Sequence, residues 1–173
     1  MAEIAKKASA AVLALGILAT PIVAFVNKFE SGNKVDTVAY VDKIGHNQPT
    51  TFCAGLTEGI VGFKVKVGQV FTVDECKRLE GVVIQKEAIQ VEKIVKVPIS
   101  VDQMVALVDF THNLGIGVLQ KSSIIKNLNA GQCKKAADSF LLYKYGTVNG
   151  KKVVLRGLEK RRKAEREMFI KDC

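Results

Sequence analysis

The sequence predicts an α+β fold, in which an N-terminal apolar helix leads into a small antiparallel β-hairpin lobe and then into a mainly helical body. Three observations predict this class. Residues 8–26 carry no charged side chain. Residues 31–63 hold short β-branched runs broken by Gly and Asn. Beyond residue 72, apolar side chains recur at helical spacing behind capping residues.

The N-terminal segment 8–26 is 19 residues long and follows Lys6 and Lys7. A helix of that length spans about 28 Å, just enough for the hydrocarbon core of a bilayer. Three interpretations compete: a buried core helix, a signal peptide cut before Phe25, and an uncleaved weak anchor. Small residues and Pro21 dilute the apolar ones, which favours the weak anchor with its N-terminus in the cytoplasm. We therefore divide the chain into an anchor, 1–26, and one folded domain, 27–173.

The hairpin lobe is expected from two β-branched runs, 35–41 and 50–53, which flank a turn at 44–49. The helical body then begins at Thr72, where Glu75 three residues later completes a capping box. Ser100 and Gln103 have the same spacing and predict a second capping box. Further helices are expected at 122–131, 132–146 and 156–173, with a turn at 148–153.

Composition and charge limit the partners. The chain has 173 residues, 48% of them apolar, enough for one domain with a hydrophobic core. Its net charge of +9 favours a polyanionic partner. Nucleic acid is not expected, because aromatic residues are few and no nucleic-acid-binding motif is present. The remaining candidates for a polyanionic partner are an anionic cell envelope and a membrane surface.

An ordered series of motifs resembles the phage lysozymes, or endolysins, with a helical body that cut bacterial peptidoglycan. A weakly apolar segment directly before "FES" is similar to the signal-arrest-release endolysins, which are exported, held on the membrane and then released. The motifs cover most of residues 29–170 and read "FES", "AYVDKIG", "TFCAGLTEG", "VGQVFTVDECKRL", "DFTHNLGIGVLQKSSIIKNLNAGQ" and "GLEKRRKAEREMF".

The resemblance implies three catalytic residues. Glu30, beside Phe29 at the end of an apolar helix, is expected to donate a proton to the leaving oxygen, and burial there would raise its pKa. Asp42 is expected to activate water or stabilise the sugar cation. Thr51 is expected to position the water.

The spacing of these residues departs from the family pattern. About three extra residues precede Asp42 and about three more precede Thr51, and matched insertions of this kind can preserve the register of a hairpin. Asp36 and Thr50 are the alternatives for the two roles. The resemblance further implies Arg161 as the charge partner of Glu30. No metal or cofactor is expected.

The four cysteines, at 53, 76, 133 and 173, favour two disulfides formed in an oxidising compartment. We expect Cys53–Cys76 to tie the hairpin to the first body helix, and Cys133–Cys173 to join the last helix to the one near residue 132. Three connectivities are possible for four cysteines, and the sequence alone does not choose among them.

The resemblance implies an enzyme that hydrolyses the β-1,4 bond between N-acetylmuramic acid and N-acetylglucosamine. Its expected partners are peptidoglycan, the host secretion machinery and, through residues 8–26, the host inner membrane. The catalytic domain would face the periplasm and later be released into it as a monomer. Two alternatives stay open: a non-catalytic wall-binding protein on a degenerate lysozyme fold, and a lytic transglycosylase.

Overall fold

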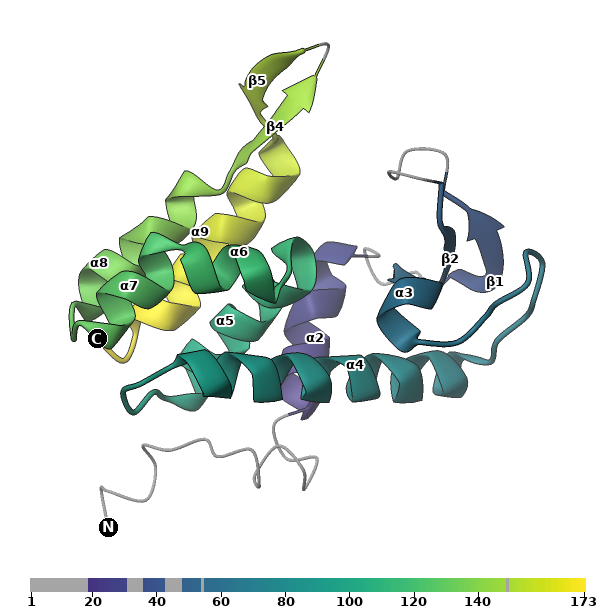
Figure 1. Ribbon diagram of the computed structural model, residues 1–173, viewed down its shortest axis with the longest axis horizontal. Helices are drawn as coiled ribbons and strands as arrows, with labels where there is room; N and C mark the ends of the chain where they lie inside the picture. Colours follow the sequence, from purple (N-terminus) through teal and green to yellow (C-terminus); the bar gives the residue numbers. More distant parts are fainter. Residues whose placement is uncertain (1–18, 31–35, 43–47, 54, 149) are drawn as a thin grey trace.

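A computed structural model of the chain describes residues 19–30, 36–42, 48–53, 55–148 and 150–173, and Figure 1 shows their arrangement. In chain order the elements are α2 (Ala19–Glu30), β1 (Asp36–Val41), β2 (Thr50–Cys53), β3 (Leu56–Thr57), α3 (Glu58–Val61), α4 (Val73–Ile94), α5 (Val101–Leu114), α6 (Ile116–Lys121), α7 (Ser123–Asn129), α8 (Cys133–Ser139), η2 (Phe140–Leu142), β4 (Tyr145–Val148), β5 (Lys151–Val154) and α9 (Arg156–Ile170).

The β lobe is a three-stranded antiparallel sheet in the order β1-β2-β3, as the fold class predicts. Its register places Tyr40 opposite Thr51 and Val41 opposite Thr50. The lobe has a small apolar core of its own, in which the rings of Phe52 and Phe71 stack 4.7 Å apart. The lobe is therefore a separately packed layer, fixed against the start of α4.

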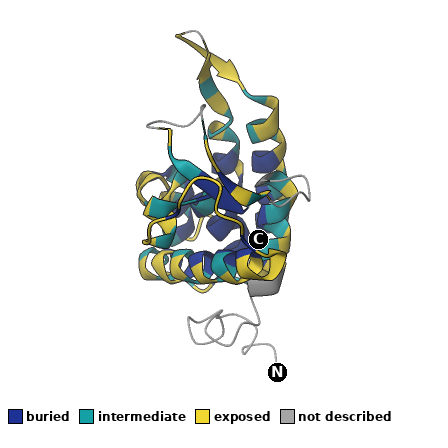
Figure 2. Ribbon diagram, turned by 90° about the vertical axis from the view of Figure 1, so that its right-hand side faces the viewer, coloured by how far each residue is buried: buried dark blue, intermediate teal, exposed yellow. Residues whose placement is uncertain are grey.

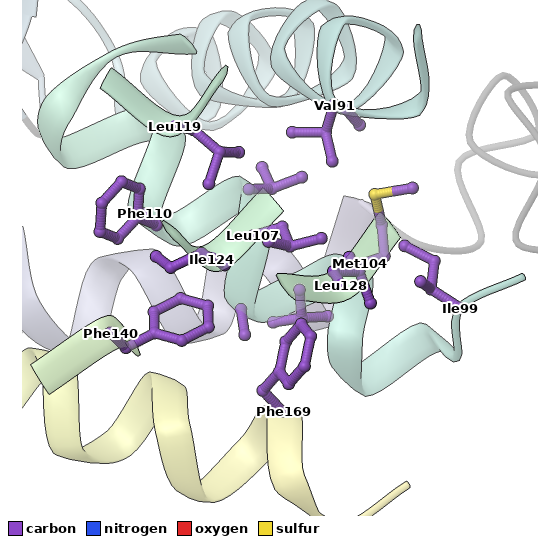
Figure 3. Packing of buried hydrophobic residues seen from close by; sticks show 14 of the residues in the cluster. Val91, Ile99, Met104, Leu107, Phe110, Leu119, Ile124, Leu128, Phe140 and Phe169 are labelled. Atoms are coloured by element: carbon purple, nitrogen blue, oxygen red, sulfur yellow. The ribbon is translucent and has the colours of Figure 1, made fainter. Parts of the chain in front are cut away.

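The helical body packs around α5, whose side chains from Gln103 to Thr111 are all buried. Helices α2, α4, α6 and α9 contact α5. Figure 3 shows the aromatic side of this core, where the Phe140 ring lies 5.7 Å from Phe110 and 5.4 Å from Phe169. Apolar burial of this extent is the main stabilising contribution in a domain of this size.

Helix α2 brings part of the predicted anchor into the body. Ile22 and Val26 are 0% and 3% exposed and belong to the main core. Figure 1 shows α2 running through the centre of the molecule beside α4 and α5. Residues 8–18 of the predicted anchor lie outside the described residues. Within the described ranges, no helix is long and apolar enough to cross a membrane.

Both predicted capping boxes are confirmed. The Thr72 hydroxyl accepts a hydrogen bond from the backbone N–H of Glu75, and the Glu75 carboxylate accepts from the backbone N–H of Thr72. Ser100 and Gln103 make the same reciprocal pair at the start of α5. These bonds satisfy backbone donors that the first turn of a helix leaves without partners.

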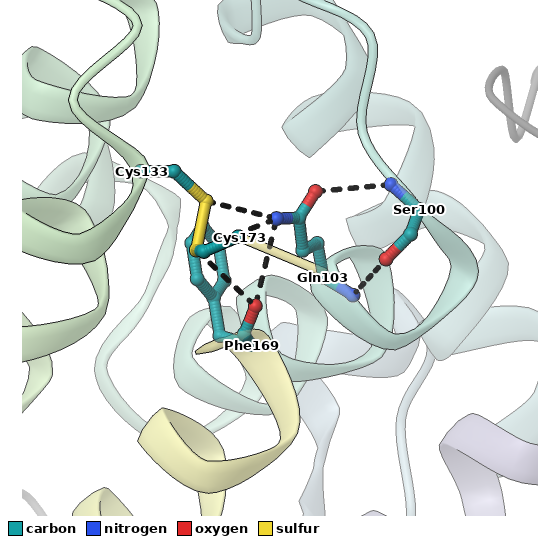
Figure 4. Close-up of a disulfide and its surroundings, with 5 residues drawn as sticks. All are labelled: Ser100, Gln103, Cys133, Phe169 and Cys173. Atoms are coloured by element: carbon teal, nitrogen blue, oxygen red, sulfur yellow. Dashed lines mark hydrogen bonds between the residues drawn. A yellow bond between two sulfur atoms is a disulfide. The ribbon is translucent and has the colours of Figure 1, made fainter. Parts of the chain in front are cut away.

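Both predicted disulfides are also confirmed. Cys53–Cys76 joins β2 to α4, and Cys133–Cys173 joins α8 to the end of the chain. Figure 4 shows the second bridge beside Gln103, whose side-chain Nε2 lies 3.2 Å from the Cys133 sulfur. One side chain of α5 thus links its own capping box to the bridge that holds the C-terminus.

The prediction of one helix over 132–146 is wrong. Helix α8 ends at Ser139, a 3-10 turn follows, and Tyr145 begins strand β4. The stretch expected only as a turn, 148–153, is the tip of the β4–β5 hairpin. Gly150 lies in that tip with φ of +74°, a conformation that favours glycine and suits a tight turn.

Candidate active site

Asp42 and Thr51 both donate a hydrogen bond to one backbone oxygen at the turn end of the β1–β2 hairpin, where residues 42–49 connect the two strands. The backbone N–H of Asp42 donates to the carbonyl of Pro49 at 3.0 Å. The Thr51 hydroxyl donates to the same oxygen at 3.3 Å. Because the hydroxyl proton is used in this bond, the lone pairs of the Thr51 oxygen remain to accept a hydrogen bond. The Thr51 side chain is buried, whereas Asp42 is half-buried.

Tyr40 lies on the same strand and faces both candidate aspartates. Partial burial raises the pKa of Tyr40, and the carboxylates of Asp36 and Asp42 raise it further. Directly opposite residues of an antiparallel pair share one face, so Tyr40 and Thr51 point to the same side of the sheet. Asp36, the alternative to Asp42, lies at the other end of β1 opposite Cys53. Of the two, Asp42 is nearer to Thr51 along the ladder.

Glu30 is the last residue of α2, and the placement of its side chain lies outside the described residues. The residue before it, Phe29, is half-buried. The Phe29 ring lies 5.5 Å from the ring of Phe25 and 5.6 Å from the guanidinium carbon of Arg161. The C-terminal end of α2 is therefore fixed against α9 by an aromatic–cation contact.

Arg161 is buried in contact with α5 as well as α2. Its Nε donates to Asp109 Oδ2 at 2.9 Å, and its Nη2 donates to Asp109 Oδ1 at 2.9 Å. The side chains of Arg161 and Asp109 are 5% and 0% exposed. This two-bond geometry fixes the plane of the guanidinium and places a negative charge directly behind it. The pairing of Arg161 with Glu30 stays a prediction.

A second buried ion pair continues the network along α9. Arg162 Nη2 donates to Glu165 Oε1 at 2.5 Å, and the Arg162 guanidinium lies 4.8 Å from the Phe110 ring centre. Burial raises the pKa of Glu165 well above its usual range, and the neighbouring Asp109 carboxylate acts in the same direction. The guanidinium groups of Arg162 and Arg161 oppose that rise. Two carboxyls and two guanidinium groups thus form one buried cluster beneath the end of α2.

The sequence analysis did not identify Asp109. A signal was available, because Asp109 interrupts the apolar run "MVALVDF" in the most buried helix of the chain. A carboxylate buried among apolar residues is expected to have a cationic partner. Its partner, however, is 52 residues away, and the sequence does not say which of the basic residues of α9 it is.

Two hollows on the surface of the described residues have volumes of about 350 and 360 Å³. The first lies at the start of α8, lined by Gly131, Gln132 and Cys133 among others, and the second lies at α3, lined by Glu58, Phe63 and Lys64 among others. Neither is lined by Asp42 or Thr51. Across the described part of the chain, no three His, Cys, Asp or Glu side chains are grouped to hold a metal ion.

Comparison with known proteins gives consistent matches over the same region. The family model described as phage lysozyme matches residues 29–165. The chain is 33% identical to a SAR-endolysin of Pseudomonas phage phiKMV, over 80% of this chain and 78% of the relative. It is 30% identical to a SAR-endolysin of Enterobacteria phage PA-2, over 95% and 94%. It is 38% identical to an endolysin of Bacillus phage B103 but spans only 41% of that protein's length.

A solved structure supports the same assignment of the fold. The endolysin from Escherichia coli O157:H7 phage FAHEc1 is 30% identical and superposes with a TM-score of 0.75, covering 88% of this chain and 92% of that one. The muramidase domain of SpmX from Asticaccaulis excentricus is 23% identical with the same TM-score and supports the fold alone.

Proposed function

The chain belongs to the phage lysozyme family, and on that premise we propose that it is an endolysin that hydrolyses the β-1,4 bond between N-acetylmuramic acid and N-acetylglucosamine in peptidoglycan. The observation that carries the proposal is the shared Pro49 carbonyl, which holds Asp42 and Thr51 at one end of the hairpin. Glycoside hydrolysis needs a proton donor for the leaving oxygen and a second group that activates water or stabilises positive charge on the sugar.

In this proposal Glu30 protonates the leaving glycosidic oxygen. Asp42 acts on the attacking water or on the positive charge that develops on the sugar. The Thr51 oxygen accepts a hydrogen bond from the water, since its own proton is donated to Pro49. No role is given to Asp36 or Thr50.

Arg161 bears on the protonation of Glu30 if the two side chains are neighbours. A lone guanidinium would lower the pKa of a nearby carboxyl and reduce the protonated fraction. Asp109 neutralises Arg161 through two hydrogen bonds of 2.9 Å. We therefore expect Arg161 to orient Glu30 while lowering its pKa less than an unpaired arginine would.

The proposal extends to residues 1–26, which would hold the enzyme on the inner membrane after export by the host secretion machinery. Ile22 and Val26 lie in the core of the body, and the same side chains cannot lie in a bilayer at the same time. Release from the membrane would therefore allow α2 to dock and carry Glu30 to the hairpin. Cleavage before Phe25 would remove Ile22 from the core, which favours an uncleaved segment.

Two experiments test these statements. Purified protein added to permeabilised cells should clear the suspension, and Glu30→Gln should not. Glu167→Gln, an exposed change on α9, should clear as the natural chain does. Equal clearing by Glu30→Gln would remove Glu30 from the mechanism. For the anchor, the intact mass of the periplasmic form should include residue 1, whereas a start at Phe25 would favour a cleaved signal peptide.

A further inference from the structure

The β4–β5 hairpin stands apart from the rest of the body. Figure 1 shows it projecting between η2 and the start of α9, and Figure 2 shows it exposed along most of its length. Every residue of its two strands is exposed except Gly146, which is half-buried. The register is regular, from Tyr145 opposite Val154 to Val148 opposite Lys151. The hairpin therefore adds little to the core, although it is well formed.

The base of the hairpin is fixed, which gives its exposed side chains defined positions. The Leu155 N–H donates to the carbonyl of Lys144 at 3.0 Å. The Leu155 side chain lies against Gly146, where an added Cβ would come within 2.5 Å of it. Gly146 thus leaves room for the Leu155 side chain at the base of the hairpin.

Positive charge is concentrated on this segment. Residues 139–158 contain four basic side chains, Lys144, Lys151, Lys152 and Arg156, and no Asp or Glu. Within the described ranges, neither Lys151 nor Lys152 forms an ion pair with a carboxylate. The Lys152 ammonium lies 4.7 Å from the centre of the Tyr145 ring, and this cation–π contact holds the ammonium in place.

The hairpin leads into α9, the helix that contacts the end of α2. Arg156 begins α9 directly after β5, and Arg161 lies five residues farther along the same helix, a rise of about 8 Å. Arg161 contacts Phe29, the neighbour of Glu30. In the view of Figure 1 the β4–β5 hairpin stands above the helical body and the β1–β2 hairpin lies to its right.

We propose that the β4–β5 hairpin is a second substrate-binding surface, on which Lys151 and Lys152 bind carboxylates of the peptides attached to the glycan strand. This inference rests on the proposed function, because it takes peptidoglycan as the polymer. Charge complementarity selects the partner: peptidoglycan peptides carry free carboxylates, and Lys151 and Lys152, unlike Lys144, form no ion pair with a carboxylate of the described residues. Its exposed valines would also suit an anionic bilayer, but its connection to α9, which contacts Phe29 at the end of α2, favours the substrate.

The test compares two substrates and two double variants of the full chain. Lys151→Gln/Lys152→Gln is measured on intact peptidoglycan sacculi and on sacculi whose carboxylates have been converted to amides. Lys134→Gln/Lys135→Gln on α8 is the control, because it removes the same charge from exposed positions elsewhere. We expect the hairpin variant to raise KM on intact sacculi roughly three- to tenfold with kcat unchanged, as befits exposed charge pairs.

On amidated sacculi the KM of the natural chain should rise to the value that the hairpin variant shows on intact sacculi. The KM of the hairpin variant should not rise further when the sacculi are amidated. Equal KM values for the hairpin and control variants on intact sacculi would overturn the proposal. The proposal would also be overturned if, on amidated sacculi, the KM of the hairpin variant exceeded that of the natural chain by the same factor as on intact sacculi. Carboxylates could not then be the ligands.

A binding measurement tests which partner the hairpin contacts, independently of catalysis. The chain has no tryptophan, so Tyr145→Trp gives a single fluorescent reporter on the hairpin. Its emission should shift to shorter wavelength on sacculi under conditions without turnover. A shift on anionic phospholipid vesicles but not on sacculi would identify a bilayer surface and overturn the proposal. Since this readout needs no catalysis, failure of the hairpin assignment and failure of the glycosidase assignment give different results.

Discussion

Asp109 and Arg161 form a buried pair with two hydrogen bonds of 2.9 Å each, which joins the most buried helix of the body to the last one. The pair lies beside Phe29, so it also fixes the end of the helix that carries Glu30. Removing one member of such a pair leaves an uncompensated charge in the interior, which costs more than the pair itself contributes.

Asp109→Asn is therefore expected to lower the free energy of unfolding by about 3 to 5 kcal/mol, because Arg161 stays buried and loses the carboxylate that accepts its two hydrogen bonds of 2.9 Å. Urea unfolding followed by circular dichroism measures the change. Asp102→Asn on the same helix is the control, since Asp102 pairs with Lys171 at the surface and its loss should cost no more than about 1 kcal/mol. Equal small losses for both variants would contradict the account of the pair.

Glu165 makes stability depend on pH. Burial raises the pKa of Glu165 in the folded state, so the folded protein holds this proton more tightly than the unfolded chain does. Its contribution is complete below the unfolded pKa of about 4.3 and is lost as pH rises toward the folded pKa. Relative to Glu165→Gln, the natural chain should lose up to about 1.4 kcal/mol of unfolding free energy per pH unit in that window.

This dependence is measured by urea unfolding of both proteins from pH 4 upward, with the exposed change Glu167→Gln as the control. The difference between the natural chain and Glu167→Gln should stay constant with pH. A difference between the natural chain and Glu165→Gln that also stays constant would mean that the pKa of Glu165 is not raised.

The disulfides close loops whose ends are 23 and 40 residues apart, and the chain-entropy model gives about 3 to 4 kcal/mol for each. Cys133→Ser/Cys173→Ser should lose about that much in thermal or urea unfolding. Cys53→Ser/Cys76→Ser should lose slightly less, because it opens the shorter of the two loops. Cys53 has φ of +52°, an unfavourable backbone conformation that the serine shares with the cysteine.

A glycine at position 53 tests whether the backbone conformation of Cys53 is strained. Cys53→Gly/Cys76→Ser should be more stable than Cys53→Ser/Cys76→Ser by about 1 kcal/mol, since glycine adopts positive φ without steric cost. If the glycine variant is instead the less stable of the two, strain at Cys53 is not a factor.

Ile22 tests whether the end of the apolar segment belongs to the folded body. The side chain is fully buried in the core shared with α4 and α5. Ile22→Ala should lower the free energy of unfolding of the released protein by about 2 to 5 kcal/mol. Ala24→Ser, at an exposed position one half-turn away, should change it by less than about 0.5 kcal/mol. Equal stability of the two variants would show that α2 does not pack as described.

Features encoded by neighbouring residues could be predicted from the sequence. Thr72 with Glu75 and Ser100 with Gln103 mark the starts of α4 and α5, because a capping box needs only residues three apart. The β1–β2 hairpin followed from its β-branched runs. Both disulfide pairings were predicted correctly, although four cysteines alone leave three possibilities.

Features that depend on distant partners could not be predicted in the same way. The Asp109–Arg161 pair joins residues 52 positions apart, and no local pattern selects that arginine. The β4–β5 hairpin was missed because its strands have four residues each and are exposed on both faces, so they carry no alternating apolar pattern. The roles of Glu30, Asp42 and Thr51 remain predictions, carried by the family resemblance and by the geometry at Pro49.

The chemical identity of the products tests the central claim most directly. Sacculi digested with the purified protein and analysed by mass spectrometry should yield disaccharide–peptide fragments that end in reducing N-acetylmuramic acid, and Glu30→Gln should yield none. Fragments that end in anhydro sugars would indicate a transglycosylase. Release of only peptides, or the same reducing fragments from Glu30→Gln, would contradict the assignment of a hydrolase that uses this glutamate.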